Sequence, residues 1–381
     1  MHFGCLLIVL VLSVFSCTAD SGSPDPVTWN LQFDLPGGEH IMEVPSGGYV
    51  VAGYRHVLRL EAGGNPLWSL AIDGQLGSNS NFRVFDMTDA HNGGYLILGF
   101  DGGPEEEMER LMVVKLNDSG EIEFDKIIAD GIFEPKVSIS KTGEGFAAVA
   151  ATVIMPGQLL LKRYELDGSG NIVSENDFGL EEETEIQLAA FSDLSGNEGY
   201  IVMTRKNPIQ GGDSETGAII KIDGQFNEEW RLPLEITEFV EVRSIVQTDD
   251  GGYLFAGTFQ SNGWIFKIGP EGSKQWEETY GTDSNGRRFI WDAVIAPEGG
   301  YVFAGKNSGK GLGDFDVWLL KTDDSGQLLW DRVHGTVGYD DARALTLTSD
   351  GGYALAGAQQ ASGTSDLKLL VMKLDEDGEL N

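Results

Sequence analysis

Apolar and polar residues follow a repeating order along this chain, and the order is clearest near its carboxyl end. Residues 344–348 (ALTLT) alternate and predict a strand, and residues 349–352 (SDGG) predict a tight turn that needs positive φ. Residues 353–357 (YALAG) and 367–373 (LKLLVMK) predict a second and a third strand, followed by a turn at residues 375–378 (DEDG). Earlier units have a fourth strand at this point, and here the sequence ends at Asn381.

The same unit recurs along the whole chain. Its marker is a glycine followed by an aromatic residue that opens the second strand; these aromatics are Tyr49, Tyr95, Phe146, Tyr200, Tyr253, Tyr301 and Tyr353. Neighbouring markers lie between 46 residues (95 − 49) and 54 residues (200 − 146) apart. A period near 50 indicates one small structural unit that is built repeatedly. No segment keeps a 3.6-residue apolar period, so almost no helix is expected.

A strand without its own unit stands near the start of the chain. Residues 27–34 (VTWNLQFD) have the character of a fourth strand with no first three. If they complete the last unit, the array closes into a ring without an unpaired edge at the seam. The sequence therefore predicts an all-β fold, a seven-bladed β-propeller of four-stranded antiparallel blades, over residues 27–381 as a single domain. A linear β-solenoid is the alternative.

Two further repeated features carry a family resemblance. A run of the form D-x-x-G-x-x-x-W follows the third strand, as in residues 323–330, and Gly-Gly-Tyr opens the second strand. These features resemble the tryptophan-docking repeats of quinoprotein-like (PQQ-like) propellers, and more closely those of bacterial surface lipoproteins with D-G-G-Y…A-G…W-L-x-K repeats. Ala150 and Thr204 replace a repeated glycine, and Ser174 replaces the tryptophan. The third and fourth blades should therefore be the least regular.

The first 26 residues predict export. Residues 1–16 resemble a lipoprotein signal peptide, Cys17 would be the lipidated residue, and residues 17–26 read as a flexible tether. The bulky Phe15 and the absence of Lys and Arg before the apolar run depart from that pattern. We expect a lipid anchor in the cell envelope, on the outer membrane or cell surface, with membrane contact only through this lipid. Ordinary secretion and a retained anchor are the alternatives.

Charge narrows the choice of partners. The formal net charge is −34, from 26 Lys and Arg against 60 Asp and Glu. Such a surface repels phosphate backbones, so nucleic-acid binding is not expected. A basic residue lies two positions before the Asp-type turn in every unit except the third, which has Glu165, and this recurrence is too regular for a ligand site. We expect this basic column to pair locally with the abundant acids.

Function is expected where the repeats differ. The loops between second and third strands, and those between blades, share one face of the predicted disc and vary widely. Ten residues before each marker aromatic lies the start of an innermost strand on that face; the seven positions are Glu39, Phe85, Lys136, Ala190, Arg243, Trp291 and Arg343. Phe85, Lys136, Arg243, Trp291 and Arg343 are the candidate ligand-binding residues, suited to an anionic or aromatic group. The alternative is that the basic ones pair with Glu241, Asp292, Asp340 and Asp341 beside them.

The sequence offers no constellation of catalytic residues. The five histidines form no metal-ligand cluster, no Gly-x-Ser-x-Gly motif is present, and no metal or cofactor is expected. The resemblance to quinoprotein dehydrogenases implies more blades and a vicinal cysteine pair, which this chain lacks. We therefore expect a monomeric, non-enzymatic binding or scaffold propeller whose partner is a protein or a glycan. A glycan-active enzyme with acidic axial residues and a scaffold subunit of envelope assembly are the alternatives.

Overall fold

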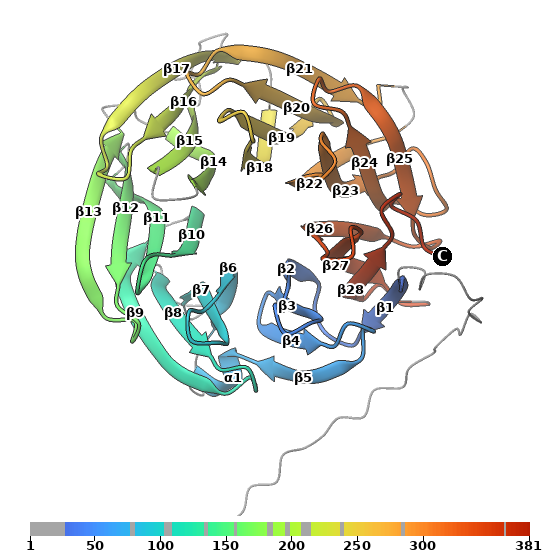
Figure 1. Ribbon diagram of the computed structural model, residues 1–381, viewed down its shortest axis with the longest axis horizontal. Helices are drawn as coiled ribbons and strands as arrows, with labels where there is room; N and C mark the ends of the chain where they lie inside the picture. Colours follow the sequence, from blue (N-terminus) through green and yellow to red (C-terminus); the bar gives the residue numbers. More distant parts are fainter. Residues whose placement is uncertain are drawn as a thin grey trace, which may run out of the picture.

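A computed structural model describes residues 27–76, 81–102, 109–132, 136–155, 158–180, 186–194, 199–206, 215–236, 240–282, 286–361 and 363–381. Seven four-stranded antiparallel sheets surround a common axis (Figure 1). The predicted seven-bladed propeller is therefore confirmed. The predicted signal peptide, Cys17 and the tether lie outside the described residues.

The blades are numbered in chain order, and each runs from its innermost to its outermost strand. They are β2 (Gly38–Glu43), β3 (Tyr49–Gly53), β4 (His56–Leu60) and β5 (Pro66–Ala71); β6 (Arg83–Asp89), β7 (Tyr95–Asp101), β8 (Glu109–Leu116) and β9 (Ile122–Ile132); β10 (Lys136–Lys141), β11 (Phe146–Met155), β12 (Gln158–Leu166) and β13 (Ile172–Leu180); β14 (Ile186–Leu194), β15 (Gly199–Lys206), β16 (Glu215–Ile222) and β17 (Glu228–Ile236); β18 (Val240–Gln247), β19 (Tyr253–Phe259), β20 (Asn262–Ile268) and β21 (Lys274–Tyr280); β22 (Arg288–Ile295), β23 (Tyr301–Asn307), β24 (Asp316–Thr322) and β25 (Leu328–His334); and β26 (Asp340–Leu347), β27 (Tyr353–Gln360), β28 (Leu367–Leu374) and β1 (Trp29–Phe33). The only helix of the described residues is α1 (Asp73–Leu76), a single turn between blades 1 and 2.

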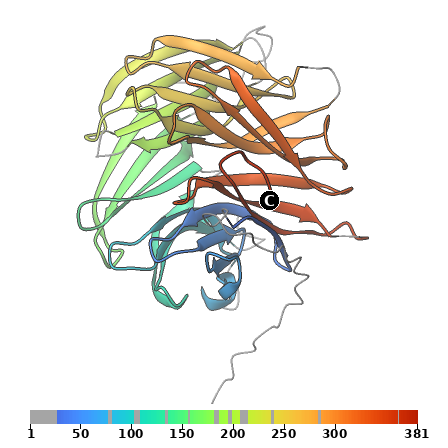
Figure 2. The same ribbon diagram turned by 45° about the vertical axis from the view of Figure 1, so that its right-hand side comes forward.

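The amino-terminal strand closes the ring as predicted. β1 pairs with β28 in antiparallel register, from Trp29 opposite Lys373 to Phe33 opposite Leu369. The Thr28 hydroxyl and the backbone N–H of Asn381 lie 2.9 Å apart. Both ribbon views place the carboxyl terminus beside the blue strands of the first residues (Figures 1 and 2).

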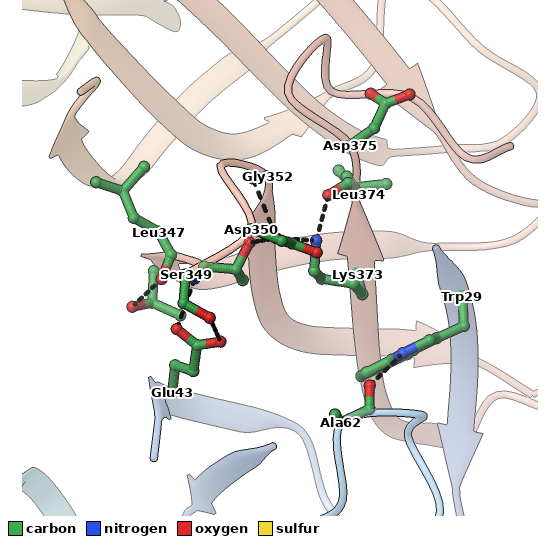
Figure 3. A network of polar contacts seen from close by, with 12 residues as sticks. Trp29, Glu43, Ala62, Leu347, Ser349, Asp350, Gly352, Lys373, Leu374 and Asp375 are labelled. Carbon is green, nitrogen blue, oxygen red and sulfur yellow. Dashed lines mark hydrogen bonds and ion pairs between the residues drawn. The ribbon is translucent and has the colours of Figure 1, made fainter. Parts of the chain in front are cut away.

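Polar contacts fasten blade 7 to blade 1 (Figure 3). The Glu43 carboxylate accepts hydrogen bonds from the Ser349 N–H at 2.7 Å and the Ser349 hydroxyl at 2.9 Å. The Trp29 indole N–H donates to the Ala62 carbonyl at 3.2 Å. Within blade 7, the buried Lys373 ammonium lies 2.9 Å from Asp350. Lys115, Lys221, Lys267 and Lys321 are likewise buried and paired with acids, which confirms the expected local pairing for these lysines. Arg59, in the same column, donates instead to the backbone carbonyls of Tyr49 and Gly47.

The core lies between neighbouring blades. One buried cluster combines Val50 and Ala52 of blade 1 with Ile97 and Val114 of blade 2. At each regular joint, an outer-strand tryptophan packs on the marker tyrosine of the next blade, as Trp68 does on Tyr95 at 6.1 Å between ring centroids. The indole N–H of Trp68 donates to the Asp118 carbonyl at 2.9 Å. A tryptophan of one blade therefore both covers and hydrogen-bonds the next blade.

Strand direction sorts the connections onto two faces. The short turns between first and second strands and between third and fourth strands form one face, which we call the turn face. The loops between second and third strands and the connections between blades form the opposite face, which we call the loop face. The described turns of the turn face contain many Asp and Glu residues and no Lys or Arg. The described turns of the turn face are therefore acidic, and basic side chains near a binding site are to be sought on the loop face.

Candidate functional site

A β-bulge in the innermost strand places the predicted site residues. In blades 1, 2, 5, 6 and 7 the strand register shifts by one residue, and the extra residue is Glu39, Phe85, Arg243, Trp291 or Arg343. A repeated glycine on the neighbouring strand faces each bulge. An ideal Cβ on Gly305 would lie 1.8 Å from the Phe289 carbonyl oxygen, and one on Gly257 would lie 1.9 Å from that of Glu241. In these five blades the glycine leaves room for the bulged strand, and the bulge turns one residue out of the strand pairing.

Two blades depart from this rule. In blade 3, Ala150 stands in place of the glycine, and β10 pairs with β11 without a bulge from Lys136 to Lys141. Lys136 begins β10, but its side chain lies outside the described part of the structure. In blade 4 the bulge falls between Leu188 and Ala190, one residue before the predicted position. Counted from the strand partner of Tyr200, the connection between β14 and β15 is one residue longer than in the other blades with a bulge, so counting ten residues back from Tyr200 gives Ala190, one residue after the bulge.

Arg243, Trp291 and Arg343 lie in one continuous set of contacts around the axis. The Arg243 guanidinium carbon lies 4.3 Å from the centroid of the Trp291 ring and pairs with Glu241. Arg343 donates to Asp341 at 3.0 Å and pairs with Glu39 across the seam between blades 7 and 1. Of the four acids named as alternative partners, Glu241 and Asp341 therefore do neutralise these arginines. Asp292 and Asp340 make other contacts.

Phe85 belongs to a separate group on blades 1 and 2. Its ring packs edge-on against Phe100 at 5.1 Å between centroids, and the Arg83 guanidinium lies 5.8 Å from it. Arg83 also reaches the exposed Tyr54, whose hydroxyl it approaches at 3.3 Å. Among the described side chains, this group makes no hydrogen bond, ion pair or ring contact with Arg243 or Trp291. The structure thus divides the predicted residues between two regions of the loop face.

Lys306 is the central residue of the larger region, and sequence reasoning missed it. Its ammonium nitrogen lies 4.9 Å from the ring centroid of Phe289, 5.3 Å from Trp291, 4.8 Å from Phe315 and 5.0 Å from Tyr339. We call these four rings the aromatic cage. Lys306 also donates to the Tyr339 hydroxyl at 2.8 Å, and that hydroxyl donates to Asp341 at 2.8 Å. The rings come from β22, from the loop before β24 and from the loop before β26, which the packing of blade 7 against blade 6 brings together.

The charge on Lys306 responds to opposing effects. Burial lowers the pKa of Lys306, the nearby Asp341 raises it, and the guanidiniums of Arg343, Arg287 and Arg243 lower it further. The ring faces oppose this lowering because their quadrupoles attract a cation. Burial, with the negative charge of Asp341, raises the pKa of the Tyr339 hydroxyl above its usual range, so Tyr339 stays neutral.

Lys306 and Arg287 have no carboxylate partner within the described residues. The exposed Arg287 guanidinium lies 5.2 Å from the Phe315 centroid, on the ring that also contacts Lys306. Arg243 and Arg343, by contrast, are paired with acids. Two cations that form no ion pair with a described carboxylate therefore flank one aromatic ring in a protein whose formal net charge is −34. The sequence signals for these two cations were the irregular loops from Lys306 to Asp316 and from Tyr280 to Arg288.

Two carboxyl groups near the axis have raised pKa values, and burial is the main cause in both Asp86 and Asp292. Asp86 accepts backbone hydrogen bonds from Met87 and, in the next blade, from Ile139, each at 2.8 Å. Asp292 accepts from Ala293 at 2.8 Å and from Leu345 of the next blade at 2.9 Å. These carboxyl groups link innermost strands of adjacent blades, so their contacts are structural.

Other site classes find little support. Within the described ranges, no group of three or more His, Cys, Asp or Glu side chains could hold a metal ion. No helix in the same part of the chain is long and apolar enough to cross a membrane. Two open hollows, of about 390 and 450 Å³, lie between blades 1 and 2 and between blades 4 and 5. Neither includes a residue of the aromatic cage.

Comparisons with known proteins bear on the fold. No family model matches the sequence, and no curated protein matches it. The WD40 domain of Neurospora crassa Pan2 is 11% identical with a TM-score of 0.55, over 92% of this chain and 96% of that chain. A protein of Lactobacillus plantarum is 13% identical with a TM-score of 0.53, over 90% and 96% of the two chains. A europium-containing methanol dehydrogenase is 11% identical with a TM-score of 0.50, over 91% and 92%. At these identities the similarities show a propeller fold and no function.

Proposed function

We propose that this protein is a non-enzymatic, lipid-anchored propeller of the cell envelope that captures a carboxylate-bearing ligand on its loop face. The binding region is the aromatic cage with Lys306 and Arg287. The observation that carries the proposal is the pair of cations against Phe315, neither of which has a carboxylate partner in the part of the chain that the structure describes. In so acidic a protein, such a pair provides a local positive site for an anion.

The rigidity of the site supports a binding role. Lys306 is held by four rings and by the Tyr339 hydroxyl, so little side-chain entropy remains to be lost when an anion arrives. Charge-assisted hydrogen bonds contribute roughly 1.5–3 kcal/mol each. Two such contacts, made by Lys306 and Arg287, are enough to make binding depend strongly on these residues and on ionic strength.

The face at which the first strand begins supports a binding site that points away from the membrane. Trp29 donates to Ala62, which lies in the turn between β4 and β5, so the first strand starts at the turn face. A lipid on Cys17 would therefore hold the molecule from the turn-face side. The loop face, with Lys306 and Arg287, would then point away from the membrane.

Calorimetric titration tests this proposal directly. The purified protein is titrated with poly-L-glutamate, with polygalacturonate and with a neutral dextran at low salt. The matched variants are K306Q/R287Q, and K126Q/R231Q on the outer strands β9 and β17, which removes the same charge. We expect at least one polyanion to bind, dextran not to bind, and K306Q/R287Q to weaken binding about tenfold or more. Equal weakening by both double variants would refute a local site.

A further inference from the structure

The loops beside the aromatic cage expose two aliphatic side chains to solvent. Val337 is 86% exposed and Leu312 is 73% exposed, which are the largest exposed fractions among the large apolar side chains of the described residues. Leu312 lies in the loop between β23 and β24, and Val337 lies in the connection between β25 and β26. We call these two residues the apolar tip.

The apolar tip is physically joined to the cage. The N–H of Asp314 donates to the Gly338 carbonyl at 3.1 Å, and Phe315 and Tyr339 form an isolated β-bridge. Phe315 and Tyr339 are also cage rings, with centroids 5.7 Å apart. The two loops are therefore adjacent, and the exposed Leu312 and Val337 belong to the same two loops as the cage rings Phe315 and Tyr339.

This combination discriminates between the ligand classes that carry carboxylates. Aromatic faces serve sugars and peptides alike, because both can stack on a ring. Contact with a polyhydroxylated chain removes little apolar surface from water, so exposed aliphatic side chains contribute little to binding such a chain. Contact with an apolar side chain removes apolar surface of both partners from water, which favours the complex. The cations beside the tip require the same ligand to be anionic.

We propose that the occupant of this surface is a polypeptide segment of a partner protein that carries acidic residues next to a large apolar side chain. Its carboxylates contact Lys306 and Arg287, and its apolar side chain covers Leu312 and Val337. The inference rests on the proposed function, since it names the partner class of the same site.

Synthetic peptides provide the test. One peptide has four glutamates around a central Leu-Phe pair, and its partner has Ser-Ser instead; poly-L-glutamate and polygalacturonate complete the set. The test variant is L312S/V337S. Its matched control is L67S/V173S, which removes two exposed aliphatic residues from the outer strands β5 and β13.

The expected result is that L312S/V337S weakens the Leu-Phe peptide about tenfold and leaves the Ser-Ser peptide unchanged. K306Q/R287Q should weaken both peptides. Equal affinity of wild type and L312S/V337S for the Leu-Phe peptide would overturn the inference. Tighter binding of polygalacturonate than of any peptide would overturn it in favour of a glycan and leave the proposed function standing. Loss of phosphatidylglycerol-vesicle binding or of self-association in L312S/V337S, without peptide binding, would overturn it in favour of a lipid surface or a second copy. Insensitivity of every probe to K306Q/R287Q would remove both proposals.

Discussion

A pair of departures from the repeat compensate each other across the joint between blades 3 and 4. At the regular joints the turn after the third strand has a glycine with positive φ, and an ideal Cβ there would lie 2.7 Å from Trp68 at Gly120 and 2.8 Å from Trp330 at Gly378. Blade 3 has Ser174 in place of the tryptophan, and the next turn has Phe226 in place of the glycine, with a φ of 67°. The Phe226 ring packs edge-on against Tyr200 at 5.3 Å and is 7% exposed. Phe226 therefore fills, from the opposite side, the space that a tryptophan occupies elsewhere.

The magnitude of the compensation follows from burial and backbone strain. Truncating a buried Phe lowers the free energy of unfolding by about 3–5 kcal/mol. Replacing a non-glycine residue in the left-handed conformation by glycine removes backbone strain and raises it by roughly 1–2 kcal/mol. F226G should therefore destabilise the protein by about 1–4 kcal/mol. S174W alone should not stabilise, because its ring would meet Phe226. In S174W/F226G the regular joint is rebuilt, and a coupling free energy of at least about 1 kcal/mol is expected.

Urea unfolding followed by circular dichroism measures this coupling from the midpoints of wild type, both single variants and the double variant. The matched control is V173W/F226G, which introduces a tryptophan at an exposed neighbour of Ser174. Additive effects of S174W and F226G, or equal recovery by V173W, would show that Phe226 does not substitute for the missing ring.

Two further predictions follow from buried groups. His56 is 3% exposed with no partner for either ring nitrogen, and burial lowers its pKa from 6.5 to about 4. Between these two pH values only the unfolded state takes up the proton, so the free energy of unfolding is unaffected by His56 above pH 6.5 and falls by about 3 kcal/mol as the pH drops to 4. H56L should lack this part of the pH dependence of the urea midpoint. An unchanged pH profile in H56L would contradict the assignment of this effect to His56. Gly305→Ala places a Cβ 1.8 Å from the Phe289 carbonyl oxygen, so it should destabilise the protein by about 2 kcal/mol or more and weaken polyanion binding by moving Trp291. In the control Gly179→Ala the added Cβ meets no atom within 4 Å, so neither stability nor binding should change. Calorimetry and thermal melting of the two alanine variants check this, and identical behaviour would refute the role of the bulge.

The sequence predicted the fold because each blade repeats the same local signals. The Gly-Tyr step, the turn glycines and the outer tryptophan each have one local physical role, so their recurrence indicated seven blades and a closing strand at residues 27–34. The structure confirms this pairing at Trp29 and Lys373. The compensating Phe226 could not be foreseen, because it depends on what a neighbouring blade lacks.

The candidate site was predicted only in part. Counting back ten residues found five bulge residues because the distance from bulge to marker aromatic is fixed where the glycine is present. The count failed at Ala190, where the turn is longer, and found no bulge at Lys136. Lys306 lies in a loop that differs from those of other blades, and its cage combines rings from β22 and two loops. No local pattern encodes that convergence.

Fluorine NMR of the protein with 5-fluorotryptophan at its eight tryptophans tests the central claim most directly. The W291F variant assigns the Trp291 resonance, and W68F and W276F assign two tryptophans whose N–H groups donate to turn-face carbonyls. On titration with poly-L-glutamate, we predict that the Trp291 resonance shifts in a saturable, salt-sensitive manner while those of Trp68 and Trp276 stay in place. Saturable binding that leaves Trp291 unmoved and shifts the turn-face tryptophans would contradict a ligand site at the aromatic cage.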